Sequence, residues 1–258
     1  MADQRSNPGA GAMSGEGTDD RVALVTGASG ALGAAVAKVL DQRGFRLALH
    51  YTSGLDRARK VAAELSRPSV VVKADVADWE QTKAMVATVE DELGPVGVLV
   101  NSGAVRLDGL MATQSVQDWT RTINVNLIGT FHTCRAALPG MLRQRWGRII
   151  NVVSPAGLIG SKGQTAYSAS KAGVMGLTRS LALECGKRKV TVNALSPGLM
   201  ATELTEEVPD EVRDALVART AFRRLGTPDE IAKGVELLVD AGYMTGQVLS
   251  IDGGISIS

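Results

Sequence analysis

A tyrosine and a lysine one helical turn apart are the first residues whose types point to chemistry. Tyr167 and Lys171 are four positions apart in a segment with helical spacing, so both side chains would lie on one helix face. A phenol ordinarily has a pKa near ~10, and a nearby ammonium favours the phenolate and lowers that pKa. The pair could then deliver a proton to a carbonyl oxygen while a hydride reaches the carbon. Ordinary exposed helix pairs share this spacing, so the pair alone is a weak indication.

A serine at the end of an apolar run strengthens this hypothesis. Ser154 follows the β-branched run Arg148–Val153, and Pro155 restricts it to an extended backbone. Ligands of parallel α/β sheets bind outside the carboxyl ends of the strands. Ser154, Tyr167 and Lys171 are separated by one loop, so we expect them to converge at one ligand site.

A glycine-rich segment near the N-terminus has the surroundings of a phosphate loop. An apolar run, Val22–Thr26, leads directly into Gly27, Gly30 and Gly33, and a helical pattern follows over Ala34–Arg43. Glycines let backbone N–H groups approach a pyrophosphate, and a helix N-terminus favours its charge. A tight structural turn without a ligand is the alternative. The strand before it and the helix after it favour a dinucleotide.

The next predicted turn indicates which dinucleotide binds. Folds that bind NAD usually place an acid about 20 residues after the glycines, but no carboxylate occurs between Arg46 and Leu55. Small hydroxyls there and the nearby Arg57 could receive a 2′-phosphate instead. Arg57 could equally be an exposed helix charge. The sequence therefore predicts NADP(H) in preference to NAD.

Strand and helix patterns alternate along the rest of the chain. The predicted strands are Val22–Thr26, Arg46–Tyr51, Val70–Lys73, Val96–Val100, Arg148–Val153, Val190–Leu195 and Gln247–Ile251. The predicted helices are Ala34–Arg43, Leu55–Leu65, Trp79–Leu93, Ser115–Arg143, Ala166–Cys185 and Ile231–Val239. Apolar runs without alternation indicate strands covered on both faces. The pattern predicts a single doubly wound α/β domain over residues 21–258, with a seven-stranded parallel sheet. Residues 1–20 have the composition of a disordered leader.

Composition excludes several other classes of protein. The 28 basic and 27 acidic residues give a net charge of +1, which argues against a broad surface for nucleic acid. Two cysteines are too few for a disulfide framework, and two histidines make a zinc site or a histidine triad hard to assemble. No apolar run approaches the ~18 residues of a membrane span, and the N-terminus has no signal peptide. We expect a cytoplasmic protein without a metal, a membrane or a nucleic-acid partner.

Several separate motifs together carry a family resemblance. They are Thr26–Gly33, Ala74–Val76, Asn101, Val125–Leu127, Ser154, Tyr167–Lys171, Pro197–Gly198 and Asp252–Gly254. In this order the chain resembles the short-chain dehydrogenase/reductase family, and more closely its 3-oxoacyl-(acyl-carrier-protein) reductases. The resemblance covers roughly residues 21–258 and implies a Rossmann-type fold.

The resemblance implies roles for individual residues. Tyr167 would be the acid in the reductive direction, Lys171 would hold the nicotinamide ribose and tune Tyr167, and Ser154 would orient the carbonyl. Asn126 would anchor a water that links Lys171 to solvent. Residues 199–220 would form a substrate lid. The implied cofactor-binding residues are Gly27, Ser29, Gly30, Ala31, Leu32, Gly33, Tyr51, Thr52, Ser53, Asp75, Val76, Asn101, Ser102, Gly103, Tyr167, Lys171, Pro197, Gly198 and Thr202.

Two departures from the family pattern affect the predicted cofactor site. The family expects glycine at Ala31, and here the glycine stands at Gly30. The family's Asn-Asn-Ala-Gly turn becomes Asn101–Ala104, with the order Asn-Ser-Gly-Ala. We interpret both as changes in cofactor fit that favour a specialised polyketide or secondary-metabolite role over housekeeping fatty-acid synthesis.

The resemblance also implies partners. Acyl carrier proteins are acidic, so a docking surface should be basic, and Arg145 and Arg188 match the docking arginines of the carrier-dependent reductases. Solvated helix ends, where cations complement the helix dipole, are the alternative. Pairing of the two long helices between subunits would give a homotetramer. The leading hypothesis is NADPH-dependent reduction of a β-ketoacyl thioester or polyketide. A dehydrogenase of a free alcohol, ketone or sugar and a non-catalytic NADP-binding sensor are the alternatives.

Overall fold

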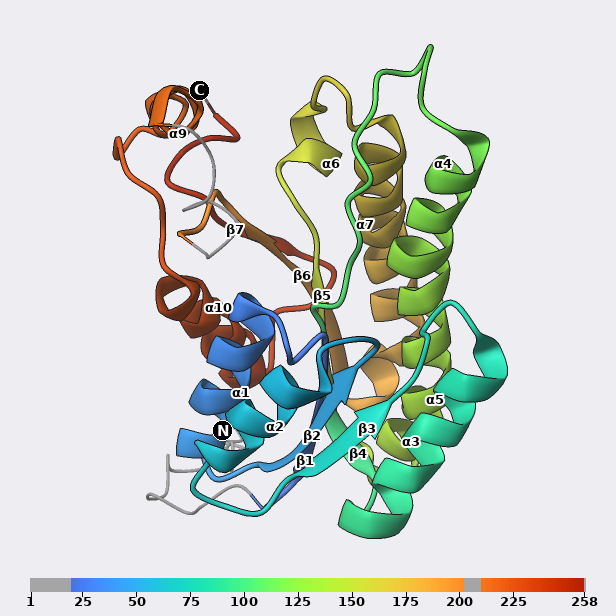
Figure 1. Cartoon of the computed structure of the whole chain (residues 1–258). Coiled ribbons are helices and arrows are strands. Elements are labelled where there is room, and N and C mark those ends of the chain that lie inside the picture. The colour runs from blue at the N-terminus through green and yellow to red at the C-terminus, as the bar shows by residue number, and fades with distance from the viewer. Residues whose placement is uncertain (1–19, 202–209, 258) are drawn as a thin grey trace, which may run out of the picture.

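One twisted parallel sheet organises the chain, and helices cover both of its faces (Figure 1). The computed structural model describes residues 20–201 and 210–257. The strand order is β3-β2-β1-β4-β5-β6-β7, and every neighbouring pair is parallel. The strands are β1 (Val22–Thr26), β2 (Arg46–Tyr51), β3 (Val70–Lys73), β4 (Val96–Asn101), β5 (Gly147–Val152), β6 (Val190–Pro197) and β7 (Val248–Ile251). The predicted seven-stranded parallel sheet is confirmed.

The helices form two layers because successive strand residues point to opposite faces. Ala23 and Val25 of β1 pack against one helix layer, and Val22 and Leu24 pack against the other. The first layer holds α1 (Ala31–Gln42), α2 (Leu55–Ala63) and α10 (Pro228–Asp240). The second layer holds α3 (Trp79–Leu93), α5 (Gly129–Gln144) and α7 (Thr165–Cys185). The core therefore lies on both sides of the sheet, as the unbroken apolar strands predict.

The helix predicted over Ser115–Arg143 is divided by a wide turn. The structure has α4 (Val116–Ile123), the π-helical turn η1 (Asn124–Ile128) and then α5. Ser115 is the N-cap of α4, since its hydroxyl accepts a hydrogen bond of 3.0 Å from the Asp118 N–H. Periodicity cannot reveal a single-turn π-bulge, because the apolar spacing on either side stays helical.

Other differences from the predicted bounds are small and have local causes. Helix α1 begins at Ala31 rather than Ala34, because Gly30 already serves as its N-cap. Strand β6 continues through Pro197, where it still pairs with Ile251 of β7. The short helices α6 (Ala156–Ile159), η2 (Gly186–Arg188) and α9 (Asp210–Ala218) were not predicted individually.

The predicted leader and part of the predicted lid lie outside the described residues. Of residues 1–20, only Asp20 is described, and the lid is described over 199–201 and 210–220. The base of the lid closes where the Ala201 N–H donates to the Gly226 carbonyl and the Gly226 N–H donates to the Leu199 carbonyl, both at 2.9 Å. Among the described residues, no helix combines the length and apolar character that crossing a membrane requires.

A buried amide network joins the strands and helices that carry the candidate site. Asn151 of β5 is fully buried, and its Oδ1 accepts a hydrogen bond of 2.9 Å from Asn101 Nδ2. Its own Nδ2 donates to Thr178 Oγ1 of α7 at 2.9 Å. Asn101 Oδ1 in turn accepts from Thr133 Oγ1 of α5 at 2.7 Å. Buried polar groups are costly unless they are paired, so this network fixes how α5 and α7 sit on the sheet.

We expect Asn151→Ala to lower the free energy of unfolding by about 2–4 kcal/mol, because it leaves a cavity and removes the partners of two buried groups. Thr178→Ser keeps the hydroxyl and should cost about 1 kcal/mol, for one buried methyl group. Urea denaturation of both variants tests this. Equal losses in the two variants would contradict a hydrogen-bonded role for the network.

Candidate active site

The three predicted catalytic residues meet at the carboxyl end of β5. Ser154 follows this strand and is half-buried, and Tyr167 and Lys171 lie in the first two turns of α7. Ser154 lies close enough to the Tyr167 phenol to lower its pKa. The Lys171 ammonium lies 5.6 Å from the centre of the Tyr167 ring. The structure thus brings together a hydroxyl, a phenol and an ammonium at the edge where the topology predicts a ligand.

The acidity of Tyr167 differs from the expectation. Burial raises the pKa of the phenol above its ordinary value of 10.0, and the nearby Ser154 hydroxyl and the charge of Arg106 only oppose this shift. The predicted lowering by Lys171 is absent, because the ammonium donates instead to the Val152 carbonyl at 2.8 Å. The phenol is therefore protonated at neutral pH, which is the form that donates a proton.

Lys171 is a cation almost sealed from water. Its exposed fraction is 4%, and burial lowers its pKa from 10.5 to about 8. Desolvation disfavours the charged form of a buried ammonium. Within the described residues its ammonium donates to a neutral carbonyl, Val152 O, so the folded chain holds a poorly compensated positive charge beside Tyr167.

The Asn126 side chain connects the loop after β4 to α7, the helix that carries Tyr167 and Lys171. Its Nδ2 donates to the Val105 carbonyl at 2.9 Å, and its Oδ1 accepts from the Val105 N–H at 2.8 Å. The same amide nitrogen is 3.3 Å from Ser170 Oγ of α7. The side chain is occupied in this way, and the backbone carbonyl of Asn126 accepts a hydrogen bond of 2.7 Å from Thr130 Oγ1. A carbonyl oxygen has two lone pairs, so the predicted water would share this atom with Thr130.

The glycine-rich loop after β1 has positions that only glycine can occupy. Gly27 has a φ of +67°, and a Cβ there would lie 2.6 Å from Gly103 Cα. A Cβ at Gly33 would lie 2.3 Å from the Gly27 carbonyl oxygen. At Gly30 the nearest atom would be 3.4 Å away, and its φ of −92° suits any residue. Close backbone approach is the property that a pyrophosphate cradle needs.

The other predicted residues of this loop contribute backbone rather than side chains. Ala31 is the exposed first residue of α1, where its methyl group meets no constraint from the helix. Leu32 packs into the core with 8% exposure, so only its N–H can face a phosphate. The Ser29 hydroxyl donates to the Ser53 carbonyl at 3.2 Å and ties the loop to the turn after β2.

The turn after β4 is fastened directly to the glycine loop. The Ser102 hydroxyl donates a short hydrogen bond to the Thr26 carbonyl, and the Gly103 N–H donates to Thr26 Oγ1 at 3.2 Å. The departure from the family's turn therefore supplies a serine hydroxyl that pins the two turns together. The Asn101 side chain points into the amide network, so any contact of Asn101 with a cofactor would come from its backbone.

His50 is a structural support of the loop that sequence reasoning missed. The Gly27 N–H donates to His50 Nδ1 at 3.3 Å, and His50 Nε2 is 3.0 Å from the Ala74 carbonyl. The exposed fraction of His50 is 2%, and burial lowers its pKa below the ordinary 6.5. At neutral pH the ring is uncharged, with Nδ1 as acceptor and Nε2–H as donor. A histidine two residues before the hydroxyl-rich turn was the available signal.

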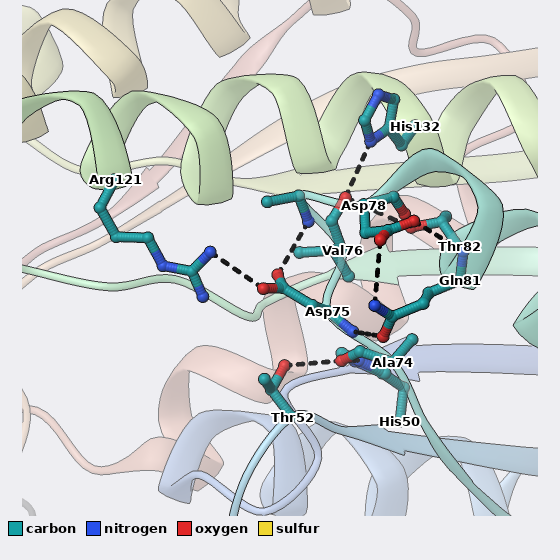
Figure 2. A network of polar contacts seen from close by, with 11 residues as sticks. His50, Thr52, Ala74, Asp75, Val76, Asp78, Gln81, Thr82, Arg121 and His132 are labelled. Atoms are coloured by element: carbon teal, nitrogen blue, oxygen red, sulfur yellow. Dashed lines mark hydrogen bonds and ion pairs between the residues drawn. The ribbon is translucent and has the colours of Figure 1, made fainter. Parts of the chain in front are cut away.

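The turn after β2 presents hydroxyls and one arginine. Tyr51 is buried at the strand end, whereas Thr52 and Ser53 are exposed. Thr52 Oγ1 donates to the Ala74 carbonyl at 2.9 Å (Figure 2). Arg57 is exposed and its Nε donates to the Ser29 carbonyl at 3.3 Å. The guanidinium thus lies where the glycine loop meets this turn, as the prediction of a 2′-phosphate site requires.

The remaining predicted cofactor residues line the ends of β3 and β6. Asp75 and Val76 follow β3, and Val76 is buried. Pro197 ends β6, and a Cβ at Gly198 would lie 2.5 Å from Asp252 Cα. Thr202 lies outside the described residues.

The predicted docking arginines are exposed but lie at the opposite edge of the sheet from Ser154. Arg145 precedes β5 by two residues, and Arg188 precedes β6 by two residues. The six residues of β5 separate them from Ser154, which is roughly 20 Å at the rise of a strand. Arg148 nearby is buried with 8% exposure and donates to the Val239 carbonyl.

The family model described as short chain dehydrogenase matches residues 21–213. The chain therefore belongs to the short chain dehydrogenase family and is an oxidoreductase, as the resemblance indicated. A 3-oxoacyl-(acyl-carrier-protein) reductase FabG from Staphylococcus aureus is 38% identical over 238 residues, which cover 90% of this chain and 97% of that protein. Nodulation protein G from Azospirillum brasilense is 39% identical over 241 residues, which cover 92% of this chain and 98% of that protein.

The buried charge of Lys171 leads to a prediction about stability. Below pH 8 the lysine is protonated in both folded and unfolded chains, and the folded chain bears the full desolvation cost. Between pH 8 and 10.5 the unfolded chain binds more protons, so stability rises with pH as this cost disappears. Lys171→Met removes the cation while keeping an apolar stem. We expect it to raise the free energy of unfolding at neutral pH by about 1–3 kcal/mol.

Thermal unfolding of the ligand-free protein at pH 7 and pH 10 measures this difference. The gap between Lys171→Met and the parent should narrow at the higher pH. A variant that is less stable than the parent at pH 7 would show that the ammonium is well compensated in the folded chain.

Proposed function

We propose that this protein reduces the β-keto group of an acyl thioester to the β-hydroxy form with NADPH. The observation that carries the proposal is the convergence of Ser154, Tyr167 and the buried Lys171 at the carboxyl end of β5. The similarity to proteins named 3-oxoacyl-(acyl-carrier-protein) reductase supports the substrate class.

The residues present fit a nicotinamide dinucleotide. Gly27 and Gly33 let the loop pack directly against the backbone at Gly103 and at Gly27 itself, and the N-terminus of α1 follows directly, so backbone N–H groups can face a pyrophosphate. When bound, the cofactor would supply a hydride to the carbonyl carbon. The glycine loop would hold its pyrophosphate, and Lys171 would hold its nicotinamide ribose.

The protein's own residues would donate the proton that the carbonyl oxygen receives and then replace it. Ser154 donates a hydrogen bond to the substrate carbonyl and fixes its direction. Tyr167 is protonated at neutral pH and transfers its proton to the carbonyl oxygen, so that the hydride and this proton together convert C=O to CH–OH. Lys171 and a water held at the Asn126 carbonyl would return a proton to Tyr167 from solvent.

The choice of NADPH rests on charge. Thr52 and Ser53 offer exposed hydroxyls, and Arg57 adds a guanidinium at the same turn. A guanidinium matches the oxygens of a phosphate in charge and geometry, whereas no carboxylate of this turn would bind a free 2′-hydroxyl.

An apolar rim supports an acyl substrate over a free sugar. Large apolar side chains are exposed on both loops that flank the catalytic residues, at Leu107, Leu110, Met111, Leu158 and Ile159. The loops are held together where the Gly109 N–H donates to the Gly163 carbonyl at 2.8 Å. Exposed apolar clusters mark binding surfaces. Fatty-acid and polyketide chains fit such a rim, and a free ketone or alcohol remains the second candidate only if it is comparably apolar.

The proposed assembly is a homotetramer in which a second copy covers the α5 and α7 surface. An apolar groove of about 680 Å³ runs between these helices and α3, lined by residues such as Phe131, Leu138 and Leu181. Arg145 and Arg188 are too far across the sheet from Ser154 of their own chain to guide a carrier to it directly. We therefore propose that they dock an acyl carrier protein for the site of a neighbouring subunit. The proposed location stays the cytoplasm.

The activity itself can be tested with acetoacetyl thioesters. We expect oxidation of NADPH to exceed that of NADH, and Tyr167→Phe to lower kcat by at least about 10²-fold, because the general acid is lost. Tyr167→Phe should still bind NADPH, which shows that it is folded. Tight NADPH binding by the parent without turnover of any β-ketoacyl thioester would overturn the substrate assignment while leaving the cofactor standing.

The docking proposal has a charge-reversal test. Arg145→Glu and Arg188→Glu should each raise KM for acetoacetyl-carrier protein about three- to tenfold and leave acetoacetyl-coenzyme A unchanged, since rim charges act through complementarity with the partner. Lys233→Glu reverses an exposed cation of α10 on the opposite face and serves as control. Equal effects on both substrates, or on the control, would contradict carrier docking.

A further inference from the structure

The sheet order shows where the adenine of a bound dinucleotide would lie. The glycine loop follows β1, and the catalytic residues Ser154 and Tyr167 follow β5 on one side of it. A dinucleotide whose pyrophosphate lies on this loop and whose nicotinamide lies beside Tyr167 must extend its adenylate to the other side. That side holds β2 and β3, and the segment after β3 is 74–78. This step rests on the proposed dinucleotide cofactor.

The Asp75 carboxylate in this segment is held at both oxygens (Figure 2). Its Oδ1 accepts a hydrogen bond of 3.0 Å from the Ala77 N–H. Its Oδ2 accepts 2.9 Å from Arg121 Nη1, which reaches across from α4. The Asp75 N–H donates to Gln81 Oε1 at 3.0 Å. The backbone and the side chain of Asp75 are therefore both fixed before any ligand arrives.

Helix α5 holds the next residue of the same segment. His132 Nδ1 is 2.9 Å from the Val76 carbonyl. A Cβ at Gly129 would lie 2.6 Å from Val76 Cγ2, so the helix backbone and the Val76 side chain are in close contact. The segment 74–78 is thus attached to both α4 and α5. Of the contacts described here, only the one with Arg121 joins opposite charges.

The fixed carboxylate remains accessible to a ligand. The Asp75 side chain is 30% exposed, and an ionised carboxylate offers about four lone-pair positions, of which two are used here. The guanidinium also neutralises the charge of Asp75. A neutralised but accessible acceptor suits an uncharged donor such as the exocyclic amine of adenine better than it suits a cation.

We propose that Arg121 is a positioning residue for the adenine end of the dinucleotide. It holds the Asp75 carboxylate in the orientation that receives the base, and it acts through Asp75 rather than by contact with the reacting atoms. An exposed ion pair without such a role contributes little and would alter the affinity for every ligand to the same extent, or not at all.

Two cofactors that differ only in the adenylate half separate these possibilities. Reduced nicotinamide mononucleotide carries the nicotinamide and its ribose phosphate but no adenine, whereas NADPH carries both halves. Dissociation constants for both are measured by nicotinamide fluorescence with the full chain. In Arg121→Gln we expect the Kd for NADPH to rise roughly three- to tenfold, because one charge-assisted hydrogen bond is lost. The Kd for the mononucleotide should stay unchanged. Arg121→Lys should restore most of the NADPH affinity.

A double-mutant cycle with Asp75→Asn tests whether Arg121 acts through Asp75. Adding Arg121→Gln to Asp75→Asn should weaken NADPH binding by less than twofold further, because coupled residues are not additive. The control is Arg43→Gln, which removes the exposed ion pairs to Glu236 and Asp240 and should change neither Kd.

Three results would overturn the proposal. They are an unchanged NADPH affinity in Arg121→Gln, an equal loss for both cofactors, and full additivity with Asp75→Asn. Failure of the proposed reductase activity is a separate result, because these measurements need no substrate turnover. NADH contains the same adenine, so the comparison holds for whichever dinucleotide binds. A parent protein that binds no dinucleotide would refute the cofactor and this inference together.

Discussion

Contact between two bare backbone turns is the constraint on which the site depends. The turns after β1 and β4 approach so closely at Gly27 and Gly103 that neither a side chain nor a water fits between them. These strands are neighbours at the point where the chain order of the sheet reverses, which is where crevices open in doubly wound sheets. The contact brings the glycine loop, the turn at Ser102 and the helix start at Ala31 to one position. The position of any ligand bound at the carboxyl edge of the sheet therefore depends on this contact.

Polar bonds then extend this contact outward in both directions. Toward β3, His50 links the Gly27 N–H to the Ala74 carbonyl, so the loop and the segment after β3 are joined through one imidazole. Toward β5, the Asn101 and Asn151 amides connect the strand ends to α5 and α7. The carboxyl edge of the sheet therefore carries a hydrogen-bonded layer above the apolar core. Such networks specify a unique arrangement when every member is paired.

Much of this architecture could be predicted from the sequence, because it follows from backbone periodicity. Strands such as Val22–Thr26 and Val70–Lys73 were found at their observed bounds, since a buried parallel strand is a short unbroken apolar run. The site residues Ser154, Tyr167 and Lys171 were found because strand ends and helix starts place them. What periodicity could not give was side-chain direction. The inward orientation of the Asn101 amide and the π-turn around Asn126 depend on neighbours from distant parts of the chain, and the raised pKa of Tyr167 depends on burial that only the packed structure reveals.

The buried Lys171 ammonium has a consequence for stability that would link the amount of this protein in a cell to its cofactor supply. A ligand that binds only the folded state stabilises it in proportion to the logarithm of its concentration over Kd. The ligand-free chain keeps a poorly compensated cation in its interior, so its free energy of unfolding is lower than that of a chain with a bound ligand. When reduced nicotinamide runs low, more molecules would open and become available to proteases. The residue that we propose for proton transfer would then also make the lifetime of the protein depend on the metabolic state of its host.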